Sequence, residues 1–136
     1  MLNRWLAAGM AGLIICGGMA VGAQASVRFA VFSDPHLFDP ALGTEGEAFE
    51  AYLAQDRKLI RESEAITQSV VASLIKAHQS EPLDFVLVSG DLTKDGERAS
   101  HEKFAAYLAQ LEAAGIAVYV IPGNHDINNP HAMAFS

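Results

Sequence analysis

Three short apolar runs alternate with two segments of helical periodicity, and this order constrains the fold more than any other feature. The runs cover residues 27–32, 84–88 and 116–121, and they are almost continuously apolar. Continuous apolar runs are typical of strands that are covered on both faces, as in parallel sheets. Strands that alternate with helices favour crossover connections between parallel neighbours. The sequence therefore predicts an α/β fold of order βαβαβ with a largely parallel sheet.

The segments between the runs carry apolar stripes at helical spacing. Residues 47–78 have helical character, and Ser63 is predicted as the N-cap of their second part. Residues 47–61 fit either a separate helix or an irregular excursion. Gly115 stands where a C-cap glycine is expected after the second stripe. The first stripe comprises Ile66, Val70, Val71, Leu74, Ile75 and His78, and the second comprises Phe104, Tyr107, Leu108, Leu111 and Ala114.

Polar side chains follow all three predicted strands. Asp34 and His36 follow the first strand, Asp91 follows the second, and the stretch Gly123-Asn124-His125-Asp126 follows the third. Each set alone has a plain structural explanation, because Asp and Asn are common turn residues. The carboxyl ends of parallel strands, however, meet at one edge of the sheet, where ligands bind. Three such sets at successive strand ends therefore predict a shared site.

Imidazole, carboxylate and carboxamide groups are combined in this predicted site. Such ligands suit divalent ions such as Mn, Fe, Zn or Ni. The site contains no thiolate, which excludes a structural zinc site of the cysteine type. One aspartate can bridge two metal ions, and two ions about 3.5–4 Å apart form a clamp for in-line displacement at phosphorus. We therefore expect a divalent-metal site with hydrolytic chemistry.

These residues resemble the N-terminal signature of the calcineurin-like metallophosphoesterase superfamily. That signature reads D-x-H, then G-D, then G-N-H-D or G-N-H-E, each after a strand. The matching stretches here are Asp34-Pro35-His36, Gly90-Asp91 and Gly123-Asn124-His125-Asp126, and the resemblance covers residues 27–126. The stretch GDLTKDGE is more similar to bacterial phosphodiesterase-type members than to Ser/Thr phosphatases. The resemblance implies the N-terminal half of an α/β/β/α sandwich.

The resemblance also implies a role for each matching residue. Asp34 and His36 would bind the first of two divalent transition-metal ions, and Asp91 would bridge both. Asn124 would bind the second ion and contact the substrate phosphate. His125 would not be a ligand but would contact the substrate as a general acid beside the leaving group, a role that suits a group titrating near neutrality. The implied reaction is hydrolysis of a phosphate mono- or diester by a hydroxide held between the two metals.

Two departures from the family pattern are visible. Ser/Thr phosphatases carry an aspartate three residues after the bridging one, which orients the catalytic histidine. Lys94 occupies that position here, Asp95 is the nearest acid, and Asp126 is the partner that we expect to hold His125. The superfamily also supplies later histidines, in a lone-His block and a G-H-x-H block, and neither block occurs in residues 1–136. We therefore expect residues 26–136 to be a truncated domain, inactive alone, whose half-sheet exposes an apolar patch.

The first 25 residues differ from the rest of the chain. Arg4 precedes residues 6–21, which are all apolar or small, and Ala23-Gln24-Ala25 then provides a cleavage pattern. This arrangement predicts a secretory signal peptide at residues 1–25, cleaved before Ser26, and a protein that is secreted or periplasmic. The rival interpretation is an uncleaved membrane anchor, although the run is shorter than the roughly 20 residues that a spanning helix needs.

Cys16 is the chain's one cysteine. It is a candidate for lipidation, but the bulky Ile15 directly before it disfavours that modification. Cleavage before Ser26 would leave no cysteine, so no disulfide would stabilise the domain. We expect contact with a membrane only through an uncleaved signal or, less favoured, through a lipidated Cys16.

The chain is acidic, with 9 Lys and Arg against 16 Asp and Glu and a formal net charge of −7. Its basic residues are spread singly, which argues against a nucleic-acid-binding surface. An acidic protein that binds a phosphate ester needs another source of positive charge, and metal ions would supply it. The alternative functions are a non-catalytic metal-binding or structural module of the same fold and, far less favoured, a generic exported α/β domain.

Overall fold

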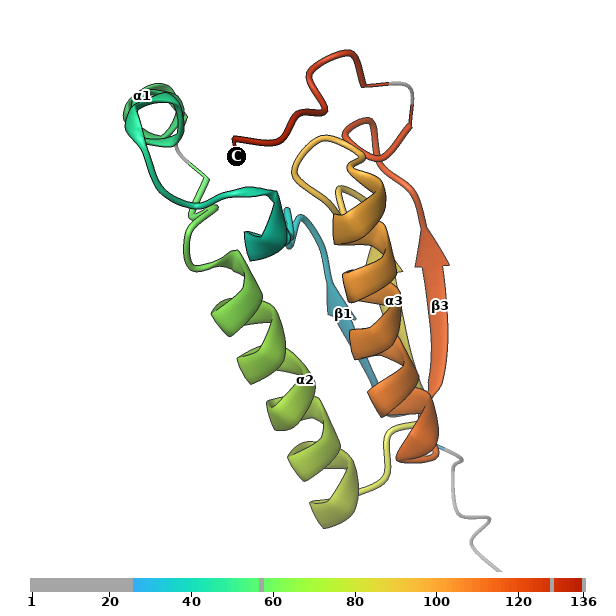
Figure 1. Ribbon diagram of the computed structural model, residues 1–136. Helices are drawn as coiled ribbons and strands as arrows, with labels where there is room; N and C mark the ends of the chain where they lie inside the picture. The colour runs from blue at the N-terminus through green and yellow to red at the C-terminus, as the bar shows by residue number, and fades with distance from the viewer. Residues whose placement is uncertain (1–25, 57, 128, 136) are drawn as a thin grey trace, which may run out of the picture.

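The computed structural model describes residues 26–56, 58–127 and 129–135, and it has the predicted βαβαβ order (Figure 1). Strands β1 (Phe29–Phe32), β2 (Phe85–Ser89) and β3 (Ala117–Ile121) form one parallel sheet in the order β1-β2-β3. The predicted α/β class and parallel sheet are confirmed. The predicted signal peptide and Cys16 lie outside the described residues.

Within the described residues, four helical elements connect and flank the strands. They are the 3-10 helix η1 (Pro40–Leu42) and the α-helices α1 (Glu47–Gln55), α2 (Ser63–Ser80) and α3 (Arg98–Ala113). Helices α2 and α3 lie side by side over one face of the sheet (Figure 1). Helix α1 is separate from them and lies near the carboxyl edge of the sheet (Figure 1). Gly115 follows α3 with a φ of 89°, as expected for a C-cap glycine. None of the helices in the described segments is long and apolar enough to cross a membrane.

The start of α2 differs in detail from the prediction. Glu62 occupies the N-cap position, and Ser63 is the first helical residue. The Ser63 hydroxyl accepts a hydrogen bond from the Phe38 backbone N–H at 3.1 Å and donates to the Ile60 carbonyl at 2.8 Å. This serine therefore fixes the loop that follows β1 instead of capping α2.

The main core lies between the sheet and helices α2 and α3. Phe104 and Leu111 of α3 are buried, as their spacing predicted. Ile66 of α2, however, is 43% exposed. The prediction for Ile66 was wrong because the buried face of α2 runs through Ser63, Thr67 and Val71. The buried members of this core are Leu37, Val71, Leu83, Val86, Val88, Leu92, Phe104, Leu111 and Ile116.

A second, smaller core joins α1 to the carboxyl edge of the sheet. Its buried members are Phe38, Phe49 and Ile60. The ring of Phe135 lies 5.7 Å from that of Phe38 and 5.3 Å from that of Tyr52, measured between centroids. The chain segment that ends at Phe135 therefore passes close to α1, as Figure 1 shows. This packing places α1 and its following loop beside the predicted site.

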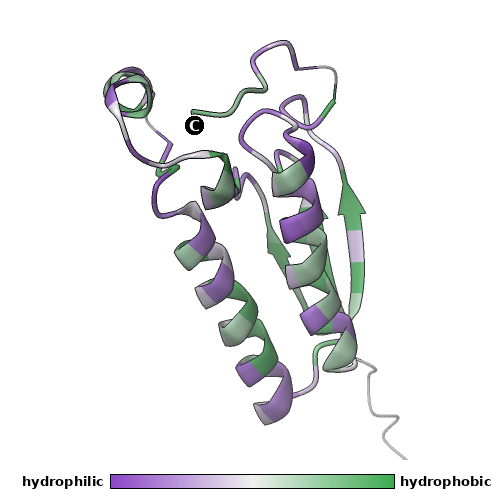
Figure 2. Cartoon of the chain, viewed as in Figure 1, coloured by the Kyte–Doolittle hydropathy of each residue, from purple (hydrophilic) through white to green (hydrophobic). Residues whose placement is uncertain are grey.

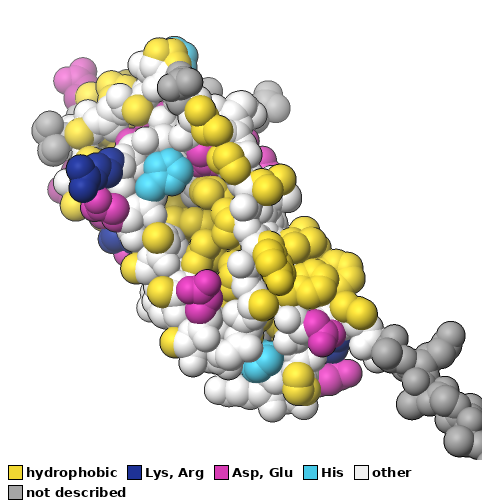
Figure 3. Space-filling model, turned by 90° about the vertical axis from the view of Figure 1, so that its right-hand side faces the viewer, with side chains coloured by type: hydrophobic (Ala, Val, Ile, Leu, Met, Phe, Trp, Pro, Cys, Tyr) yellow, Lys and Arg dark blue, Asp and Glu magenta, His cyan; other side chains and the backbone are white. Residues whose placement is uncertain are grey.

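Within the described residues, helices cover only one face of the sheet. On the open face, Phe29, Val31, Tyr119 and Ile121 are each more than half exposed. Phe85 stacks on Phe29 with 5.1 Å between ring centroids. Strand β3 is largely hydrophobic (Figure 2), and hydrophobic side chains gather on one side of the molecule (Figure 3). The expected exposed apolar patch is present, whereas cover on both faces is not seen in the described part of the chain.

Candidate metal centre

The loops that follow β1 and β2 continue to pair after the strands end. The backbone N–H of Asp34 donates to the Gly90 carbonyl at 3.1 Å, and the N–H of His36 donates to the Asp91 carbonyl at 3.0 Å. A further parallel bridge joins Leu37 to Thr93. These bonds hold the D-x-H stretch beside the G-D stretch, as the sequence predicted for neighbouring parallel strands.

Asp34, His36 and Asp91 share an unusual backbone conformation. Their φ angles are 54°, 43° and 48°, and they are the non-glycine residues with positive φ in the part of the chain that the structure describes. Left-handed backbone is uncommon for residues other than glycine and costs on the order of 1–3 kcal/mol at each position. Such strain concentrates at functional sites. Here it coincides with three of the four predicted metal ligands.

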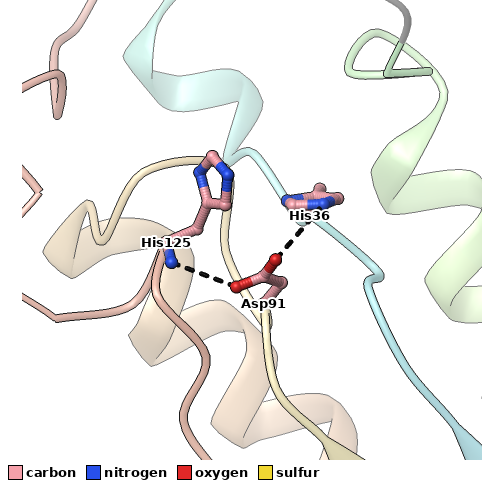
Figure 4. A group of neighbouring side chains, drawn as sticks. All are labelled: His36, Asp91 and His125. Atoms are coloured by element: carbon pink, nitrogen blue, oxygen red, sulfur yellow. Dashed lines mark hydrogen bonds and ion pairs between the residues drawn. The ribbon is translucent and has the colours of Figure 1, made fainter.

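Two glycines allow β2 and β3 to end in close contact. A Cβ atom on Gly90, whose φ is 92°, would lie 2.9 Å from the Gly123 Cα. A Cβ atom on Gly123 would collide with the side chain and backbone of Asp91. This approach lets the His125 backbone N–H donate to Asp91 Oδ1 at 3.0 Å (Figure 4). The third motif therefore orients the carboxylate of the second.

The side chains from these loops converge on one point. His36 Nε2 lies 3.9 Å from Asp34 Oδ1 and 3.9 Å from Asp91 Oδ2. One donor atom each from His36, Asp91 and His125 lie within 4.8 Å of one another (Figure 4). An imidazole between two carboxylates is a donor set that divalent transition ions accept, so these residues fit the predicted metal.

The environment of His36 favours its neutral form. Burial lowers the pKa of His36, and the positive charge of Lys58 lowers it further, against the opposing effect of the Asp91 carboxylate. A neutral imidazole is the form that binds a metal ion. The Nδ1 atom of this ring is buried and has no hydrogen-bond partner among the described residues.

Asn124 lies in the same turn as His125. The residue is exposed. The turn places it directly between Gly123 and His125. Its predicted role as a ligand of the second metal stays a prediction.

His125 is oriented by Asp95. Its Nδ1 atom lies 2.9 Å from Asp95 Oδ1, and its ring stands perpendicular to that of His36 with 4.9 Å between centroids. The expectation that Asp126 holds this histidine was wrong. Asp95 lies one position beyond the aspartate of the Ser/Thr phosphatase pattern, yet its carboxylate reaches the same ring.

Asp126 instead joins the second and third motifs. Its carboxylate accepts hydrogen bonds from the backbone N–H groups of Leu92 at 3.0 Å, Thr93 at 2.9 Å and Gly123 at 2.7 Å. Burial raises the pKa of Asp126, but these backbone hydrogen bonds outweigh that effect and lower it. The carboxylate therefore fixes the turn that carries His125 against the loop after β2.

Lys94 is fully buried behind Asp95, a feature that the sequence analysis missed. Its ammonium pairs with the Asp95 carboxylate, lies 3.6 Å from Glu97 Oε1 and faces the Tyr52 ring at 4.4 Å. Burial raises the pKa of Asp95, but hydrogen bonds from Lys94 and His125 outweigh it and lower the pKa. The signal available in the sequence is the Lys94-Asp95 pair, which follows Thr93 directly.

The fold and these three motifs are those of the calcineurin-like phosphoesterase family. The family model for calcineurin-like phosphoesterases matches residues 27–136, and the chain belongs to this family. It is similar to the 3',5'-cyclic adenosine monophosphate phosphodiesterase CpdA of Vibrio vulnificus, with 29% identity over 101 residues, 74% of this chain and 30% of that enzyme. It is also similar to the 3',5'-cyclic-nucleotide phosphodiesterase alr5338 of a Nostoc species, with 41% identity over 61 residues, 44% of this chain and 22% of that enzyme.

The chain spans less than a third of the length of these curated relatives. The part of the chain that the family model matches nevertheless includes the carboxyl edge of the sheet, where Asp34, His36, Asp91 and His125 lie.

Proposed function

We propose that this chain forms the N-terminal, metal-binding part of a dinuclear-metal-dependent phosphodiesterase. The observation that carries the proposal is the left-handed backbone shared by Asp34, His36 and Asp91 at the ends of two adjacent strands. Asp and His enter left-handed backbone more readily than most residues, but here all three occurrences fall on predicted metal ligands. The class of phosphodiester is that of the two relatives, whose names specify 3',5'-cyclic nucleotides.

The residues of the site would divide the work as follows. Asp34, His36 and Asp91 would hold two divalent ions, with Asn124 as a further ligand. Bound ions of this kind polarise a phosphoryl group and lower the pKa of water, so that hydrolysis can proceed near neutral pH. The backbone N–H of His125 orients Asp91, which keeps one carboxylate oxygen directed at the neighbouring His36.

His125 would protonate the leaving oxygen. Asp95 would accept a hydrogen bond from Nδ1–H and stabilise the charged imidazolium, so that Nε2 carries the proton that is transferred. Lys94 balances the charge of Asp95 from the buried side. This arrangement of a histidine with a carboxylate on its far nitrogen is the general means of fixing the tautomer of a proton-transferring imidazole.

The test uses the full-length, metal-loaded enzyme. We expect hydrolysis of a 3',5'-cyclic nucleotide that is lost on chelation and restored by one of Mn, Fe, Zn or Ni. Asp91→Asn should lower both the metal content and the rate, whereas Asp84→Asn, far from the site, should lower neither. A chelated enzyme that retained full activity would contradict the proposal.

The second candidate is a non-catalytic metal-binding module of the same fold. It would bind metal with the same dependence on Asp91 but turn over no phosphate ester. Intact ligands at all matching positions favour the catalytic interpretation, and turnover measurements on the metal-loaded protein separate the two.

We also propose that the protein is exported, on the pattern of Arg4, the apolar stretch and Ala23-Gln24-Ala25. N-terminal sequencing of protein from a secretion-competent host should begin at or near Ser26. Recovery of the intact chain, with Met1, in a membrane fraction would contradict this and favour the uncleaved anchor.

A further inference from the structure

Lys58 brings a positive charge to the candidate metal centre from outside the three sequence motifs. It lies in the connection between α1 and α2, and its Nζ atom is 3.4 Å from Nδ1 and 3.5 Å from Nε2 of His125. Its side chain is 22% exposed, so the ammonium is sheltered but reachable. No motif in the sequence analysis assigned it a role.

The position of Lys58 is fixed by its neighbours. Its backbone N–H donates to Asp56 Oδ1 at 2.9 Å, and its Nζ atom lies 3.9 Å from Asp56 Oδ2. Asp56 in turn accepts a hydrogen bond from the Tyr52 hydroxyl of α1, which belongs to the smaller core. A lysine tied in this way is preorganised, and it loses less conformational freedom when it binds a ligand.

Lys58 also lies between two cavities that open beside the site. A cavity of about 280 Å³ is lined by Asp34, His36 and Lys58 together with apolar residues of α2. A second cavity of about 320 Å³ is lined by Lys58, Asp95 and His125, among others. Lys58 therefore lines both cavities together with residues of the candidate site.

The ammonium and the His125 ring are both able to donate hydrogen bonds, yet they face each other. An anion placed beside both groups would accept hydrogen bonds from Lys58 and from His125. A phosphoryl group supplies such an anion, with oxygens that accept from both donors. Lys94 cannot take this role, because it is fully buried and paired with Asp95 and Glu97.

We propose that Lys58 is a phosphate-binding residue that contacts a non-bridging oxygen of the phosphate ester beside His125. The proposal rests on the proposed phosphodiesterase function. A fixed cation at this position stabilises the negative charge that develops on the phosphoryl oxygens in the transition state. It also supplies local positive charge in a chain whose net charge is −7.

The test compares Lys58→Ala, Lys58→Arg and Lys76→Ala in the full-length, metal-loaded enzyme. Lys76 is an exposed lysine of α2 and serves as the matched control. We expect Lys58→Ala to lower kcat/KM for bis(4-nitrophenyl) phosphate by roughly 10²–10³-fold, as removal of one charge-stabilising donor does. Metal content should be unchanged, Lys58→Arg should recover part of the loss, and Lys76→Ala should match the wild type.

A binding measurement separates failure of this proposal from failure of the proposed function. Calorimetric titration of each metal-loaded variant with inorganic phosphate should show at least tenfold weaker binding for Lys58→Ala, even if the wild type hydrolyses no ester. Equal phosphate affinity and equal kcat/KM in Lys58→Ala and the wild type would overturn the proposal. Loss of metal from Lys58→Ala would also overturn it, because Lys58 would then support the ligands and not the substrate.

Discussion

Asp95 Oδ1 lies 2.9 Å from Nδ1 of His125, and it approaches that ring from a position one residue beyond the one used in Ser/Thr phosphatases. Lys94 occupies the earlier position and pairs with the other oxygen of the same carboxylate. The loop after β2 therefore keeps a carboxylate on the histidine although the spacing has changed. Lys94 and Asp95 together make a buried ion pair, and Asp95 connects this pair to His125 in the site.

The first prediction concerns the orientation of His125. Asp95→Asn replaces an acceptor with a group that can present an N–H to Nδ1, so the tautomer is no longer fixed. We expect kcat of the full-length enzyme to fall by roughly 10²–10⁴-fold, the usual contribution of general acid catalysis, because that catalysis depends on the tautomer of His125. Metal content by elemental analysis should stay unchanged.

The matched control is Glu102→Gln, an exposed acid on α3 that pairs with Arg98. It should leave kcat unchanged. If Asp95→Asn lost metal in proportion to its loss of rate, the carboxylate would be supporting the metal ligands and not the histidine.

The second prediction concerns stability against acid. The pKa of Asp95 is lowered in the folded protein from its ordinary value of 3.8. A lowered pKa means that the ionised carboxylate stabilises the fold above the unfolded pKa, and that this contribution is lost as the pH falls through the folded pKa. Urea unfolding of the metal-free protein should therefore show a decline in unfolding free energy below about pH 4, the ordinary range of an aspartate.

Asp95→Asn should be less stable than the wild type at neutral pH and should show a shallower decline in acid. The reason is that the amide cannot titrate and that the buried Lys94 loses one of its two charged partners. An unchanged slope in the variant would show that other carboxylates account for the acid sensitivity.

The third prediction separates Asp126 from the chemistry. Asp126→Ala removes the acceptor for the N–H groups of Leu92, Thr93 and Gly123. Leaving such donors unsatisfied costs roughly 1–3 kcal/mol of unfolding free energy. Chemical denaturation measures this loss, and kcat per correctly folded, metal-loaded molecule should change far less than in Asp95→Asn. A loss of kcat as large as that of Asp95→Asn would restore Asp126 as the partner of His125.

Much of the fold and of the site's location could be predicted, because the apolar runs and the strand-end residues are local signals. Parallel pairing then brings Asp34, His36 and Asp91 together without further information. The partner of His125 could not be predicted, since the competition between Asp95 and Asp126 is decided by the geometry of two loops. The carboxylate nearest in sequence is engaged by backbone N–H groups, and the one 30 residues away reaches the ring.

The buried face of α2 and the role of Lys58 could also not be predicted from the sequence. A shift of one residue in the α2 stripe turned Ile66 outward and Thr67 inward, which periodicity alone resolves poorly in a helix rich in small residues. Lys58 lies in the connection whose structure the sequence left open, and its place depends on how α1 packs through Phe49 against Phe38.

The fourth prediction contrasts two adjacent residues of the turn after β3. In the full-length enzyme, Asn124→Ala should lower occupancy of one metal together with the rate, because a ligand is lost. His125→Ala should keep both metals and slow the reaction by roughly 10²–10⁴-fold, the usual contribution of a general acid. The loss in His125→Ala should shrink for esters with good leaving groups, which need no proton. Elemental analysis, with turnover across esters of varied leaving-group pKa, measures both effects.

His125 also lies within 4.8 Å of the donor atoms of His36 and Asp91. If the His125→Ala enzyme lost its metal, His125 would therefore be a metal ligand. If the substitution slowed the hydrolysis of all esters equally, His125 would act only electrostatically and not as a general acid.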